Sequence, residues 1–147
     1  MQTIIKKLRN AKMAHKRWVG HASAMIEGIP IEKDQVPINY TDCKFGCWYY
    51  DEGQSLYSLN EFKAIEDPHT ELHLIYMEIF NILFEKKKQS LFSKLIGKSA
   101  KLSDENKKLA RAKFRTLEHV SKQIIMKLDA LEEKIKRMSP DEFSNIY

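Results

Sequence analysis

The chain has 147 residues, 43% of them hydrophobic and 10% aromatic, which suits one domain with a buried core. No stretch approaches the roughly 20 uncharged apolar residues of a membrane span, and the first ten residues lack the apolar run of a signal peptide, so we expect a cytoplasmic protein without membrane contact. The net charge of +5 is spread among acidic residues, and we interpret its densest cluster, Lys86 to Lys88, as a solvated helix face and not a nucleic-acid site.

The segment from Gln2 to about Glu27 is predicted to be a long helix. Gly28 followed by Pro30 ends it. Its apolar positions recur every three or four residues, at Ile4, Leu8, Ala11, His15, Trp18, Ala22 and Met25. His15 thus lies on the buried stripe, although a lone buried histidine is more often hydrogen-bonded than bound to metal. His21 falls off the stripe, and we place it at the surface or rim.

Both cysteines of the chain lie in one short stretch, Cys43-Lys-Phe-Gly-Cys47-Trp-Tyr, after a loop with two prolines. We expect Asp42 to cap a short helix from Cys43 to about Tyr50. Cys43 would then lie at a helix N-terminus, which favours the thiolate that a metal requires. The alternative is that both thiols are small buried apolar groups in a reduced compartment. Gly46 would allow close approach of a neighbouring backbone, and the aromatic residues would exclude water.

A second long helix is predicted to begin at Asp67-Pro68-His69, after another short helix from Leu56 to Ile65. Gly97 closes the long helix, with a bend expected near Lys86 to Ser90. Its inner face is marked by Leu72, Tyr76, Ile79, Leu83, Leu91 and Leu95. His69 and His73 are four residues apart, so their imidazoles lie on one face and can reach a common point.

The last helix is predicted to start at Leu102 or Ser103 and to stop at Ser139-Pro140. Its apolar stripe resembles a coiled-coil seam, which could serve the bundle core, a dimer contact, or both. We treat His119 as structural. The predicted domain covers residues 1–139, followed by a tail, residues 140–147, that is loose or packed locally. No alternation of apolar and polar residues predicts a sheet.

Three long helices and short helical segments predict an all-α, antiparallel bundle, and such bundles hold metal sites between facing helices. Four side chains then offer nitrogen and sulfur ligands that suit tetrahedral zinc: His15, Cys43, His69 and His73. A di-iron site would need Glu-x-x-His pairs on two helices, and the pair formed by Glu66 and His69 has no counterpart.

These motifs resemble the chemoreceptor zinc-binding (CZB) domain over about Met13 to Phe80. The resemblance rests on His15-Lys-Arg-Trp18, Cys43-Lys-Phe-Gly46-Cys-Trp48-Tyr49 and His69-x-x-x-His73. It implies a four-helix bundle that binds zinc through three histidines and one cysteine, and it implies a homodimer. Members are usually attached to bacterial chemoreceptors or cyclic-di-GMP synthases, in which zinc, or an oxidant acting at the zinc-bound cysteine, changes the output.

No signalling hairpin or cyclase domain accompanies these motifs, so we expect a free-standing sensory module for a separate chemoreceptor or signalling enzyme, a zinc buffer, or a piece of a longer protein. Four protein ligands leave zinc no position for water, so we expect no enzyme. The alternatives are an adaptor with a structural zinc that acts through its last helix, and a zinc hydrolase with Glu66 or Glu71 as base. Cys47 is not assigned as a ligand; it either packs or resolves an oxidised Cys43 into a disulfide.

Overall fold

The computed structural model describes residues 1–29, 39–84 and 104–147, and these ranges contain helices and no strand. The predicted all-α class is confirmed. The elements in chain order are α1 (Gln2–Ile26), α2 (Lys44–Tyr49), the 3-10 helix η2 (Glu52–Leu56), α3 (Asn60–Lys63), α4 (Glu66–Phe84), α6 (Asp104–Arg137) and α7 (Pro140–Ser144).

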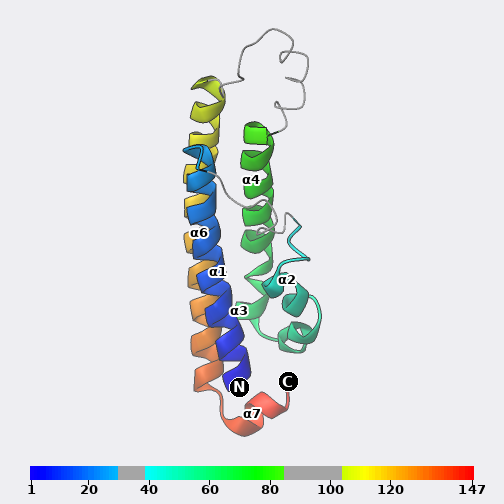
Figure 1. The fold of residues 1–147 in the computed structure, drawn as a ribbon. Coiled ribbons are helices and arrows are strands. Elements are labelled where there is room, and N and C mark those ends of the chain that lie inside the picture. Colours follow the sequence, from blue (N-terminus) through cyan, green and yellow to red (C-terminus); the bar gives the residue numbers. More distant parts are fainter. Residues whose placement is uncertain (30–38, 85–103) are drawn as a thin grey trace.

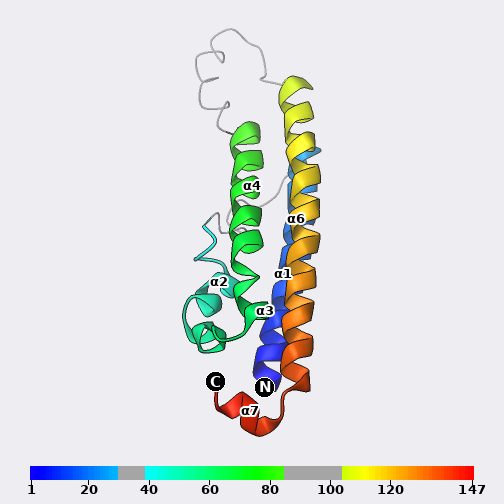
Figure 2. The same ribbon diagram turned by 180° about the vertical axis from the view of Figure 1, so that it is seen from behind.

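The three long helices α1, α4 and α6 lie side by side along most of the molecule (Figures 1 and 2). α6 runs antiparallel to α1 and α4, which point in the same direction, and it packs along both of them. The short elements α2, η2 and α3 pack beside the lower half of these helices, with α2 against α1 and α3 against α6. This arrangement places α2 next to the part of α1 that carries His15.

The stripes predicted on the long helices are the buried ones. In α1, Ile4, Leu8, Ala11, His15, Trp18 and Ala22 are buried as expected, and Ile26 takes the place predicted for Met25. In α6, the seam from Leu117 to Ile135 is buried throughout, against α1 and α4. The seam therefore serves the core of this chain, and it is not free to act as the outer contact that an adaptor or a dimer would use.

A buried carboxylate joins α1 to α6. Only 5% of the Glu132 side chain is exposed, and it accepts salt bridges from Arg9 at 2.8 Å, Lys12 at 2.7 Å and Lys136 at 2.9 Å. Lys12 also reaches Asp129 at 2.6 Å. A buried carboxylate is stable only when its charge is compensated in this way, so the network fixes how α1 lies on α6.

Several predicted boundaries shift. The single short helix expected from Leu56 to Ile65 is two elements, η2 and α3, and α4 begins at Glu66. α6 ends at Arg137, and the expected tail holds the helix α7, whose capping residue is Ser139 and whose Phe143 is buried. The predictions for residues 85–103, including the bend, Leu91, Leu95, the stop at Gly97 and the start at Leu102 or Ser103, lie outside the described residues. Within the described part of the chain, no helix is long and apolar enough to cross a membrane.

Candidate metal centre

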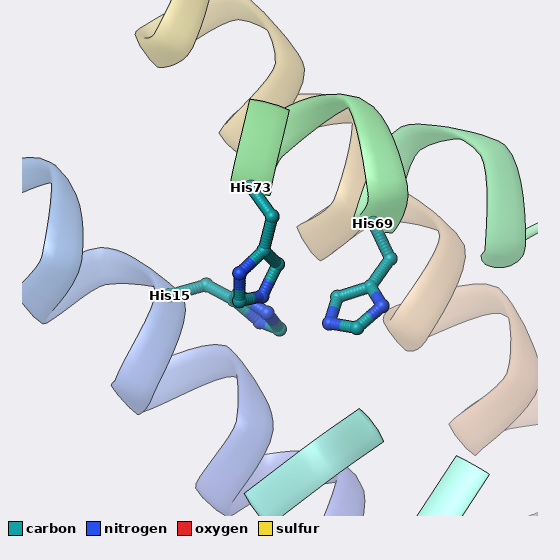
Figure 3. Close-up of side chains that lie close together, drawn as sticks. All are labelled: His15, His69 and His73. Carbon is teal, nitrogen blue, oxygen red and sulfur yellow. The ribbon is translucent and has the colours of Figure 1, made fainter. Parts of the chain in front are cut away.

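Three buried imidazoles converge between α1 and α4. His15 comes from the buried stripe of α1, and His69 and His73 come from successive turns of α4 (Figure 3). Each of the three offers one ring nitrogen, and these atoms all lie within 4.8 Å of one another. The expected convergence of the three histidines is therefore present in the structure.

The fourth predicted side chain, Cys43, reaches the same place from the start of α2. Its Sγ lies 3.4 Å from Nε2 of His69, and the residue is only 2% exposed. The sulfur is not one of the atoms in the 4.8 Å group, so it adjoins that group on the His69 side. Three separate elements thus bring three nitrogens and one sulfur to one buried site.

The predicted cap of α2, Asp42, is wrong, because the residue that caps this helix is Cys43. The Cys43 backbone is extended (φ −71°, ψ 151°), and its Sγ accepts a hydrogen bond from the Gly46 amide at 3.0 Å. A cap side chain accepts from the first turn, and here the sulfur takes the role usually filled by oxygen. The capping bond holds the sulfur at the site.

Gly46 is required at its position. A Cβ there would run into the carbonyl oxygen of Tyr40 and lie 3.2 Å from Cα of Thr41. The close backbone approach predicted for this glycine is thus real, and it folds the stretch before α2 back over the first turn.

Burial keeps the imidazoles of His15 and His69 neutral at pH 7. Burial, together with the neighbouring His15 and His73, lowers the pKa of His69 to about 2. Burial and the neighbouring His73 lower the pKa of His15 to about 4, although the Ala11 carbonyl acts in the opposite direction. Neutral imidazoles at pH 7 keep their lone pairs available for a metal ion.

The thiol of Cys43 behaves differently from the prediction. Burial raises its pKa and outweighs the lowering by the amides of Gly46 and Phe45 at the helix start. The helix terminus alone therefore does not make the thiolate. A cation bound next to Cys43 would lower the pKa of the thiol, because its positive charge favours the deprotonated sulfur.

Aromatic rings wall the site. Phe45 lies edge-on to His69 with ring centres 5.0 Å apart, and Trp18 lies perpendicular to His73 at 4.7 Å. Trp18 was predicted only as a core residue; its place on the same stripe as His15 was the available indication of this role. Both rings exclude water and restrict how the imidazoles can turn.

The donor set fits zinc. Nδ1 of His15 is buried with no hydrogen-bond partner, which is costly unless another group satisfies it, and Nε2 of His69 faces the Cys43 sulfur. Nitrogen and thiolate ligands are those of tetrahedral zinc. No carboxylate joins the histidine group among the described residues, and Glu66 and Glu71 are exposed, which disfavours a di-iron centre and the hydrolase alternative.

The remaining candidates lie elsewhere. Cys47 is exposed and its Sγ donates to the carbonyl of Thr41 at 3.3 Å, so the expected packing role is wrong. His119 is exposed and contacts Gln123 one turn further along α6. His21 is half-buried on α1, two turns from His15.

Comparison with known families agrees with this geometry. Residues 15–80 match the family model of the chemoreceptor zinc-binding domain. The matched stretch begins at His15 and includes Cys43, His69 and His73. This part of the chain is therefore similar to a chemoreceptor zinc-binding domain. No curated protein and no solved structure matches the chain.

Proposed function

We propose that the chain binds one zinc ion through His15, Cys43, His69 and His73, and that the zinc occupancy of this site is a regulatory signal. The proposal is supported by the convergence of the three buried imidazoles, with the Cys43 sulfur 3.4 Å from Nε2 of His69, although these residues come from three elements that are far apart in the sequence.

The proposed mechanism is a change in packing. Because α1, the start of α2 and α4 each contribute ligands, zinc would connect them, and its binding free energy would stabilise the arrangement in which all four ligands meet. When bound, zinc supplies the positive charge that keeps the Cys43 sulfur deprotonated. Loss of the metal, or oxidation of that sulfur, would release α2 from the two histidines of α4.

Four protein ligands would leave no coordination position for a substrate or water, so the function we propose is binding and regulation and not turnover. By the resemblance to its family, the output would belong to bacterial signalling, of the chemotaxis or cyclic-di-GMP type. We propose that the module acts in the cytoplasm, as a homodimer, on a separate chemoreceptor or signalling enzyme. The adaptor alternative has less support because the seam on α6 is buried.

The test combines metal content with stability. Native protein, Cys43→Ser and His73→Ala are loaded with zinc under reducing conditions and analysed by mass spectrometry, with His119→Ala as the control because His119 is exposed and does not belong to the histidine group. We expect near-stoichiometric zinc in the native protein and in the control, and a large loss in the two ligand variants.

Zinc at one hundred times its dissociation constant should stabilise the fold by about 2.7 kcal/mol. For a chain of this size that corresponds to a rise in melting temperature of roughly 5–11 °C. Equal melting of chelated and zinc-loaded protein would show that the metal does not select a packing, and the regulatory proposal would fail.

A further inference from the structure

A groove of about 830 Å³ runs along α1, between this helix and the segment from Asp42 to Trp48. Its α1 wall includes Lys7, Ala11, Ala14, Trp18 and His21. These residues are spaced in alternating steps of four and three, the spacing of a seam along which a second helix packs. Fourteen residues of helix span about 21 Å, or four turns.

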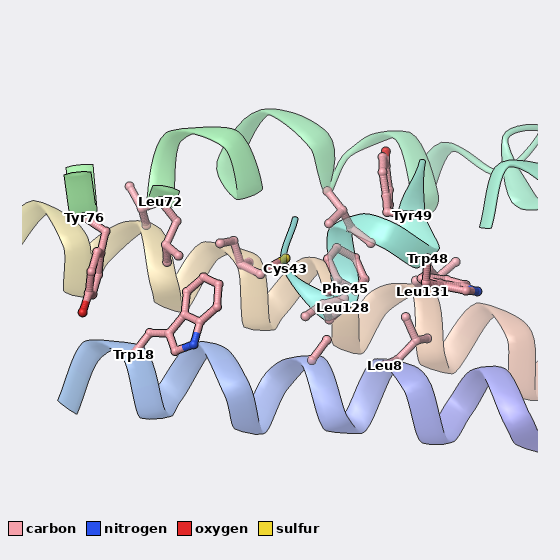
Figure 4. Packing of buried hydrophobic residues seen from close by; sticks show 14 of the residues in the cluster. Leu8, Trp18, Cys43, Phe45, Trp48, Tyr49, Leu72, Tyr76, Leu128 and Leu131 are labelled. Atoms are coloured by element: carbon pink, nitrogen blue, oxygen red, sulfur yellow. The ribbon is translucent and has the colours of Figure 1, made fainter. Parts of the chain in front are cut away.

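The walls of the groove carry aromatic side chains at two points and small side chains between these points. Trp18 and Trp48, the two tryptophans of the chain, both line it, as does Phe45. Figure 4 shows Trp18, Cys43, Phe45 and Trp48 following one another along α1. Nε1 of Trp48 is buried without a hydrogen-bond partner, although the side chain lines an open groove. Ala11 and Ala14 would let another backbone approach closely.

The rim of the groove is cationic. From Gln2 to Ile26, α1 carries six Lys and Arg residues and no acidic residue, and two of the six, Lys7 and Arg17, line the groove. Arg17 and Lys44 stand on opposite walls, are exposed, and form no salt bridge with any residue in the described part of the chain. Lys7 is paired with Glu52 at 2.7 Å, and among the residues that the structure describes, Asp42 is the one acidic residue of the lining.

We propose that this groove docks an acidic amphipathic helix of a separate partner protein. The volume of the groove is roughly half that of a four-turn helix 10 Å in diameter, so one helix face would be buried and the other would remain in water. Apolar side chains of the partner would lie over Ala11 and Ala14 between the two tryptophans, and its carboxylates would pair with Arg17 and Lys44. A second copy using the same face would oppose two cationic rims, which disfavours it.

The position of the groove deepens the proposed function. His15 and Cys43 line the groove as well as the candidate zinc site, so the docked helix would cover two of the four proposed ligands. A link between helix docking and zinc binding rests on the proposed function, whereas docking of the helix itself does not. If the two events are linked, zinc must change the affinity for the helix by the same factor by which the helix changes the affinity for zinc.

The probe is a synthetic 15-residue helical peptide with Leu at i, i+3, i+4 and i+7 positions and Glu on its flanks, compared with a peptide that has Gln in place of every Glu. Binding is measured by anisotropy of a dye on the peptide and by intrinsic tryptophan fluorescence, which reports from the groove because both tryptophans line it.

The decisive variant is Arg17→Glu/Lys44→Glu, and the matched control is Lys6→Glu/Lys16→Glu, which makes the same charge change at exposed residues that do not line the groove. We expect the first variant to bind the acidic peptide at least ten-fold more weakly, the control less than three-fold, and the Gln peptide to bind weakly to both. Circular dichroism and zinc content, unchanged in both variants, would show that the fold is intact.

Equal weakening in the two variants, or binding without a change in tryptophan fluorescence, would overturn the docking site, because the attraction would then come from the overall charge. Self-association in ultracentrifugation that is abolished by Arg17→Glu/Lys44→Glu would make a second copy the occupant and would also overturn it. Peptide binding by a protein that takes up no zinc would leave docking in place and overturn the zinc proposal.

Discussion

Replacing Gly46 with alanine is expected to damage both the fold and the site. The added Cβ would run into the Tyr40 carbonyl oxygen and lie 3.2 Å from Cα of Thr41, so backbone must move to make room for it. Overpacking of this kind costs about 1–3 kcal/mol. Movement of the Gly46 amide would also lose the 3.0 Å bond to Cys43 Sγ, for about another 1 kcal/mol.

We therefore expect Gly46→Ala to destabilise the protein by about 3 kcal/mol, which lowers the melting temperature of a chain of this size by roughly 6–12 °C. The zinc affinity, measured with a competing chelator, should fall as well, because the capping bond holds the proposed sulfur ligand in place.

Gly20→Ala is the matched control. Gly20 is exposed inside α1, and a Cβ there meets no atom within 4 Å. Alanine is the better helix former, so this variant should be more stable by about 0.5–1 kcal/mol. If Gly46→Ala unfolded within 1 kcal/mol of the native protein and kept its zinc affinity, the assigned role of this glycine would be refuted.

Three further predictions concern other parts of the molecule. Burial raises the pKa of Glu132, but hydrogen bonds from Lys12, Lys136 and Arg9 lower it by more, so that the pKa is about 2. Its stabilising contribution is therefore complete above about pH 4.5 and is lost as the pH falls toward 2. In urea unfolding at pH 7, Glu132→Gln should lower the free energy of unfolding by about 1–3 kcal/mol, and it should remove most of the loss of stability between about pH 4.5 and pH 2. The Glu133 side chain is 54% exposed, so Glu133→Gln should change the free energy of unfolding by less than about 0.5 kcal/mol. Cys47→Ser should keep the native zinc affinity within two-fold in chelator competition while Cys43→Ser loses at least 100-fold; a comparable loss in both would assign the thiols wrongly. Tyr49→Phe should cost about 1 kcal/mol in thermal unfolding because the buried hydroxyl donates to the Phe62 carbonyl at 3.2 Å, and an unchanged melting point would show that this bond contributes nothing.

The helices and the histidine cluster could be predicted because they depend on short repeats. The stripe of α1 places His15 in the core by its spacing from Ala11 and Trp18, and a separation of four residues is enough to align His69 with His73. The bundle architecture then brings these faces together, so periodicity carries most of the information needed.

The cap and the buried ion network could not be predicted in the same way. Asp42 is the better cap by residue type, but the backbone of Tyr40 packs on Gly46 and leaves Cys43 in the capping position. From the sequence, Glu132 next to Leu131 is expected to be a charge at the surface. It is buried because Arg9 and Lys12, more than 100 residues earlier in the chain, donate hydrogen bonds to it. Contacts between distant segments are not encoded in local spacing.

The groove along α1 was also outside the reach of the sequence. By its spacing, Arg17 lies off the apolar stripe of α1, which predicts only that it faces solvent. Phe45 and Trp48 were expected only to exclude water from the metal site. Only the packing of α2 beside α1 shows that the same residues border an open groove, with Arg17 on one wall and Lys44 on the other.

The most direct test of the account is X-ray absorption at the zinc edge on the zinc-loaded native protein. We expect one sulfur at about 2.3 Å and three nitrogens at about 2.0–2.1 Å around each zinc ion, with the sulfur contribution lost in Cys43→Ser. A shell of nitrogen and oxygen alone in the native protein, or a sulfur contribution that persists in Cys43→Ser, would contradict the assignment of His15, Cys43, His69 and His73 as the zinc ligands.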